Sequence, residues 1–125
     1  MSEIGLCEEL SMDAIDYTLA NIRADRQLHY ENYQLGSFVQ ALCGFVTLNM
    51  VAVSMHCIGE EVHVYFYLEH ASEADNEAIE EVIFELEALQ FALVPLISHI
   101  SVVGASINVA NIEGRAVYRR YVGTP

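Results

Sequence analysis

The stretch Val-His-Val-Tyr-Phe-Tyr-Leu-Glu, residues 62–69, alternates apolar side chains with histidine, tyrosine and glutamate. A period of two over eight residues is typical of a β-strand with one buried face. Residues 48–56 alternate in the same way, and Cys57-Ile58-Gly59-Glu60-Glu61 between the two runs suits a turn. The sequence therefore predicts an antiparallel hairpin. Four residues form its buried face on the second strand: Val62, Val64, Phe66 and Leu68.

After the hairpin the period becomes helical. Ser72-Glu73-Ala74-Asp75 resembles a capping box and predicts a helix that runs to about Phe91. Its core stripe has spacings of three and four: Ile79, Val82, Ile83, Leu86 and Leu89. Pro95 ends helical structure. Leu96–Val103 and Arg115–Val122 then predict a third and a fourth strand, joined by Gly104–Gly114.

Two helices are predicted before the hairpin. Ser11 can cap a helix that runs to about Arg23, because apolar residues recur on one stripe of this segment. Residues 25–36 are polar and aromatic and end in Gly36, which indicates a connection. Ser37 then opens a short helix from Phe38 to about Cys43.

The predicted order is α-α-β-β-α-β-β in a single domain, residues 1–125. This order fits an α+β fold: a four-stranded, mostly antiparallel sheet with helices packed on one face. A chain of 125 residues can bury a hydrophobic core without disulfides or metal ions to stabilise it.

The charge balance is strongly acidic. The chain has 18 Asp and Glu against five Arg and no Lys, a net charge of −13, and residues 27–114 contain no Lys or Arg. Such a protein repels phosphate backbones and anionic lipid, which excludes direct binding of nucleic acid and argues against the membrane surface. A basic protein is the partner that this charge favours.

Cysteine content and the N-terminus predict a cytoplasmic protein. Cys7, Cys43 and Cys57 include no short-spaced pair, which argues against a disulfide framework, and the N-terminus lacks a basic secretory-signal region. The uncharged runs Leu35–Ile58 and Phe91–Ile112 contain Gly, Asn, Ser and His and alternate like strands, so we expect no membrane span.

No motif for catalysis or metal binding is found. The five His and three Cys lack zinc-site spacing, and no nucleophile elbow or phosphate-binding glycine loop is present. We therefore predict no catalytic residue, metal or cofactor, and a protein that is not an enzyme. A small enzyme that uses His63 with Cys57 or a carboxylate is the least favoured alternative.

The feature that points to function is an acidic surface that contains aromatic residues. Residues 60–87 hold ten acids and no Lys or Arg, and the helical period places several of them opposite the core stripe together with Phe84 and Phe91. An aromatic residue within a charged face is typical of an interface anchor. Two alternatives stay open: the N-terminal helix buries both rings, or the acids serve solubility alone.

Tyr65 and Tyr67, beside His63 and Glu69, are expected on the open side of the sheet. Tyrosine is frequent in binding surfaces, although a half-exposed sheet face without a partner is an equally simple interpretation. The predicted charge contacts are Glu69, Glu73, Asp75, Glu77, Glu80 and Glu81, and the predicted anchors are Tyr65, Tyr67 and Phe84.

Three segments resemble a known family. They are the helix-to-strand segment 39–53, the segment 64–77 with Val-Tyr-Phe-Tyr-Leu and Ser-Glu-Ala-Asp-Asn-Glu, and the closing Gly-Arg-Ala-Val-Tyr-Arg-Arg, residues 114–120. Together they resemble small bacterial immunity proteins of contact-dependent growth inhibition and related polymorphic toxin systems. The resemblance extends from Ser37 to the end of the chain, although Leu96–Ile112 matches no part of the pattern.

The resemblance implies binding without chemistry. Such proteins cover a cognate toxin C-terminal domain, often a basic nuclease, in many cases with an acidic surface that stands in for nucleic acid. The expected partner is thus such a toxin, and the expected state is a monomer or weak homodimer. An acidic adaptor or chaperone-like module, which would bind several partners at modest affinity, is the main alternative. Arg115, Arg119 and Arg120 are expected to pair with the protein's own acids.

Overall fold

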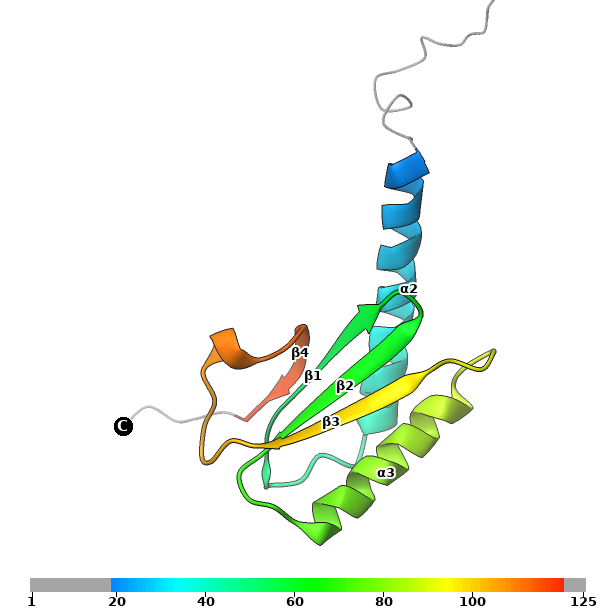
Figure 1. Cartoon of the computed structure of the whole chain (residues 1–125). Helices are drawn as coiled ribbons and strands as arrows, with labels where there is room; N and C mark the ends of the chain where they lie inside the picture. Colours follow the sequence, from blue (N-terminus) through cyan, green and yellow to red (C-terminus); the bar gives the residue numbers. More distant parts are fainter. Residues whose placement is uncertain (1–18, 121–125) are drawn as a thin grey trace, which may run out of the picture. The chain divides into compact units, whose positions relative to one another are not determined.

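The computed structural model of the chain describes residues 19–120. These residues form an α+β fold of two helices and a four-stranded mixed sheet (Figure 1). The elements follow one another as α2 (Leu19–Leu42), β1 (Met50–Ile58), β2 (Glu61–Leu68), α3 (Glu73–Ala88), β3 (Leu96–Val102), a 3-10 turn (Val109–Asn111) and β4 (Arg115–Arg119). The described order is therefore α-β-β-α-β-β instead of the predicted α-α-β-β-α-β-β.

The prediction of two helices joined by a connection at residues 25–36 is wrong. One helix, α2, continues through this segment to Leu42. Residues 25–36 include Arg, Gln, Leu and Glu, which favour helix, and Gly36 costs an α-helix only about 1 kcal/mol. The predicted N-cap at Ser11 lies outside the described residues.

The chain divides into two compact units, one up to Asn32 and one from Tyr33 onward. The first unit contributes the N-terminal turns of α2. The second contains the last turns of α2, the sheet and α3. The single domain predicted for residues 1–125 stays a prediction.

The sheet has the order β3-β2-β1-β4. The predicted hairpin is confirmed: β1 and β2 are antiparallel, with Val53 opposite Phe66 and Met55 opposite Val64. The strand β4 also pairs antiparallel with β1, whereas β3 pairs parallel with β2 over seven residues. The sheet is therefore mixed. A parallel neighbour needs a crossover connection, and α3 supplies it.

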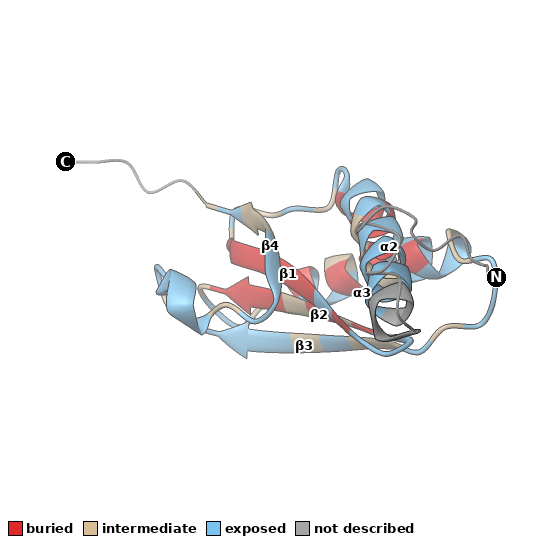
Figure 2. Ribbon diagram, turned by 90° about the horizontal axis from the view of Figure 1, so that it is seen from above, coloured by how far each residue is buried: buried red, intermediate tan, exposed pale blue. Residues whose placement is uncertain are grey.

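The core lies between the two helices and one face of the sheet. Val62, Val64 and Phe66 are completely buried there, and the Phe66 ring packs edge-on against Phe38 of α2 with 6.0 Å between centroids. The helix α3 buries Ile79, Val82 and Leu86. Figure 2 shows the buried parts of β1 and β2 in red and most of β3 in pale blue.

We predict that Phe66→Ala lowers the free energy of unfolding by about 3–5 kcal/mol, because the ring is fully buried and its removal leaves a cavity. Phe84→Ala is the matched control, since 64% of that side chain is exposed and its loss should change stability by less than about 0.5 kcal/mol. Urea unfolding measures both. Equal losses for the two variants would contradict the assignment of the core.

The continuity of α2 is tested by Gly36→Ala, which should stabilise the protein by about 0.5–1 kcal/mol because Gly36 lies inside the helix. Gly44→Ala is the control: Gly44 follows the helix at φ +88°, where alanine is strained. An added Cβ meets nothing within 4 Å at either position, so the pair isolates the backbone effect. Destabilisation by Gly36→Ala in urea or thermal unfolding would indicate that the helix does not run through this residue.

Candidate partner-binding surface

The helix α3 places most of the acids. It begins after Ser72, whose hydroxyl accepts a hydrogen bond from the Asp75 N–H at 3.2 Å, and it ends at Ala88 instead of the predicted Phe91. Glu73 lies in the first turn, where the helix dipole favours a negative charge. Because Ile79, Val82 and Leu86 are buried against the sheet, the acids between them face outward.

The outward side of α3 forms one surface, which we call the acidic α3 surface. Six carboxylates and one aromatic ring are exposed on it: Glu73, Glu77, Glu80, Glu81, Glu85, Glu87 and Phe84. The helix has no basic residue in its last turn and no Lys or Arg anywhere. Within residues 33–120, no ion pair reaches these six acids. Their charges therefore add to a field of one sign.

Two of the predicted charge contacts are turned toward the protein's own chain. Asp75 is 5% exposed and accepts a hydrogen bond from the Asn49 side chain at 2.5 Å. Glu69 forms an ion pair with Arg120 at 3.0 Å. These two carboxylates therefore stabilise the fold, and they are not part of the acidic α3 surface.

Arg120 fastens three parts of the chain. Besides Glu69, its guanidinium donates to the carbonyl oxygens of Leu48 at 2.9 Å and Ala105 at 2.6 Å. The expectation that Arg120 pairs with an acid of its own chain is confirmed. Gly114, at the other end of β4, has φ +67°, and a Cβ there would lie 2.8 Å from that of His56. One end of β4 is thus fixed by the contacts of Arg120, and the other packs closely against β1 at Gly114.

Tyr65 and Tyr67 lie on the sheet face opposite the helices. Tyr65 is half-buried and stacks on His99 with 4.5 Å between ring centroids. Burial raises the pKa of its phenol, and Glu113 and Tyr67 raise it further. Tyr67 is 5% exposed, and its hydroxyl accepts a hydrogen bond from the Glu113 N–H at 2.9 Å. The nine predicted contact residues therefore do not form one continuous surface.

The aromatic residues near the acids are exposed. Phe84 is 64% exposed, and Phe91 is 95% exposed although it stacks on Tyr33 with 5.9 Å between centroids. The Tyr33 hydroxyl donates to the Leu89 carbonyl at 2.7 Å, which joins α2 to the end of α3. No residue between 33 and 120 buries Phe84. The alternative that the N-terminal helix covers it concerns residues 11–23, whose side chains lie outside what the structure describes.

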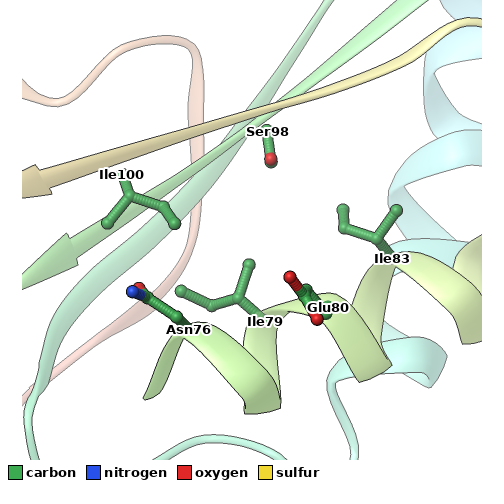
Figure 3. Close-up of a pocket in the computed structure, with 6 residues that line it drawn as sticks. All are labelled: Asn76, Ile79, Glu80, Ile83, Ser98 and Ile100. Carbon is green, nitrogen blue, oxygen red and sulfur yellow. The ribbon is translucent and has the colours of Figure 1, made fainter. Parts of the chain in front are cut away.

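A groove between α3 and β3 was not predicted. It has a volume of about 390 Å³, and in Figure 3 the isoleucine side chains of the helix point toward the strand. It is lined by Asn76, Ile79, Glu80, Ile83, Ser98 and Ile100. The signal for it in the sequence is the uncharged Leu96–Val102 beside an acidic helix, but the pairing of this strand cannot be derived from local pattern.

Of the residues proposed for the enzyme alternative, His63 and Cys57 do not come together, whereas His63 does contact a carboxylate, that of Glu61. Cys57 pairs in register with Val62, on the helix-covered face of the sheet, whereas the neighbouring His63 points to the other face. Its ring bonds to His99 at 2.9 Å and Glu61 at 3.0 Å. The described residues contain no group of three or more His, Cys, Asp or Glu arranged to hold a metal ion. None of the described helices is long and apolar enough to cross a membrane.

Comparison with known families matches residues 31–122 to the model of the MafI2 immunity protein. This match covers most of the chain, including the sheet, α3 and the surface described above. The chain belongs to the MafI2 immunity protein family. No curated protein matches the sequence.

MafI2 immunity proteins act against MafB polymorphic toxins. The protein is therefore an immunity protein that neutralises a cognate toxin, and it is not an enzyme. The family match supports the predicted resemblance at the level of polymorphic toxin immunity.

We predict that Tyr67→Phe lowers the free energy of unfolding by about 1 kcal/mol, because the Glu113 N–H loses its acceptor. The affinity of the folded protein for its toxin should stay within about twofold of the original, because the lost hydroxyl lies against the protein's own chain. Urea unfolding and titration with the toxin measure the two effects. Loss of affinity with unchanged stability would instead identify Tyr67 as a contact residue.

Proposed function

We propose that this MafI2 protein neutralises a basic nuclease toxin by covering it with the acidic α3 surface. The observation that carries the proposal is the row of exposed carboxylates on α3, which no cation of residues 33–120 neutralises. A nuclease must present positive charge to its phosphate substrate. A surface of matching negative charge competes for the same region.

Phe84 is the proposed anchor of the complex. Its ring is 64% exposed although it lies among carboxylates, and removing such a ring from water provides affinity that charge alone does not. Glu77 and Glu81 precede it on the same side of the helix, two turns and one turn away. The charges would then accelerate association, and the ring would slow dissociation.

The proposal is narrower than the set of residues predicted from sequence. The exposed residues Glu73, Glu77, Glu80, Glu81 and Phe84 are retained as contacts. Tyr65, Tyr67, Glu69 and Asp75 are not needed for this surface, because each has a partner within the chain.

The first test reverses charge beside the anchor. The double variant Glu77→Lys with Glu81→Lys should reduce the association rate with the cognate toxin domain at least tenfold at low salt, because it adds cations to the contact. The control is Glu60→Lys with Glu61→Lys, at the end of the β1–β2 turn and the start of β2, which changes the net charge equally and should reduce the rate less than threefold. Stopped-flow or surface plasmon resonance at two salt concentrations measures both.

Equal effects of the two double variants would contradict the assignment of the contact to α3, because the net charge alone would then explain the change in association rate.

The nuclease part of the proposal is tested separately. The purified toxin domain should cleave RNA or DNA, and an equimolar amount of the immunity protein should stop cleavage. A toxin domain that is neutralised but cleaves neither polymer would overturn the nuclease assignment.

A further inference from the structure

The two edges of the sheet are protected differently. The edge strand β4 has five residues, two of them Arg, and its pairing with β1 contains a register shift. Short length, charge and irregular pairing are the usual means by which an edge strand avoids further pairing. The edge strand β3 has seven residues, Leu-Ile-Ser-His-Ile-Ser-Val. It contains no proline and, when its histidine is neutral, no charge, and its register with β2 has no irregularity.

The hydrogen bonds show which residues of β3 face outward. The Val62 N–H donates to the Pro95 carbonyl at 2.9 Å, and the Val103 N–H donates to the Leu68 carbonyl at 2.8 Å. In a parallel ladder the residues that bond to the neighbouring strand alternate, so Ile97, His99 and Ser101 bond to β2. The N–H and C=O groups of the other residues point away from the sheet: Leu96, Ser98, Ile100 and Val102.

Among the residues whose N–H and C=O groups point away from the sheet, two have side chains that face the groove. Ser98 and Ile100 are in register with Val64 and Phe66 of the core face, and both line the groove beside α3. Ile100 is 44% exposed and Val102 is 57% exposed. One edge therefore offers unpaired backbone groups and an apolar groove together, which is the arrangement that accepts an added strand.

The charge beside this edge selects the kind of strand. Glu80 lines the groove, and Glu73, Glu77 and Glu87 are exposed on the same helix. A second copy of this chain would bring two acidic α3 helices together, which like charges oppose. A segment with Lys or Arg would place its cations next to these carboxylates.

We propose that the β3 edge binds an extended, basic segment of the cognate toxin, which adds to the sheet as a fifth strand and places its apolar side chains in the α3–β3 groove. This inference rests on the proposed function, because the toxin is the partner, and it adds the backbone as a means of recognition. Main-chain hydrogen bonds would supply affinity, and the groove with Glu80 would supply selectivity.

The test is amide hydrogen exchange by NMR on the full chain, alone and bound to its purified cognate toxin domain. The Ser98 and Ile100 amides should exchange at least tenfold more slowly in the complex, because they gain acceptors. The His99 and Ser101 amides are the internal control, since they already bond to β2 and should change little. An intact complex in which Ser98 and Ile100 exchange at the free rate would overturn the edge assignment and leave the immunity function standing.

A pair of variants at one position provides a second measurement. Ser98→Pro removes one outward N–H without removing a bond to β2 and should weaken toxin binding at least tenfold. Ser98→Ala keeps the N–H and should bind within about threefold of the original protein. Equal binding by Ser98→Pro, with its fold verified by NMR, would contradict the proposal.

Two further outcomes are informative. A free chain that is dimeric, with slow Ser98 and Ile100 amides before toxin is added, would assign the edge to a second copy and overturn the proposal. Absence of any binding to the toxin domain would instead contradict the proposed function itself.

Discussion

The parallel pairing of β2 with β3 is the constraint on which the rest of the structure depends. Two parallel neighbours cannot be joined by a tight turn, so the chain must leave the sheet and return along one face, and α3 is that crossover. The core face of β2 determines which side of α3 is buried. The acids on its other side are consequently held on a rigid element beside an edge strand, instead of on a loop.

The local elements could be predicted from sequence, whereas their partners could not. Alternation over residues 62–69 and the cap at Ser72 are short-range signals, and both predicted elements are present. Whether Gly36 ends a helix or lies inside one depends on backbone conformation, which composition does not reveal. The burial of Asp75 and Tyr67 depends on Asn49 and Glu113, which lie 26 and 46 residues away. Contacts at such separation have no pattern within one sequence, so the sequence could not show that these two side chains are turned toward the protein's own chain.

The residues that stabilise the fold are separate from the acids exposed on α3, which suits an inhibitor that performs no chemistry. Stability comes from buried residues such as Phe38 and Phe66. It also comes from hydrogen bonds within the chain, such as those of Arg120 with Glu69 and of Asp75 with Asn49. The acids exposed on α3 contribute little to folding and repel one another slightly. In the proposed complex, the rigidity of this helix avoids the affinity that would be lost if the surface had to become ordered during binding.

The position of β4 sets an order of events during synthesis. The strand β1 is translated about 60 residues before β4, yet β4 is one of its two neighbours in the finished sheet. At roughly 5–20 residues per second, this interval lasts several seconds. Throughout that time the nascent chain exposes an edge of its central hairpin that Gly114 and Arg120 later help to close. The sheet is therefore complete only after the last strand of the chain has been made.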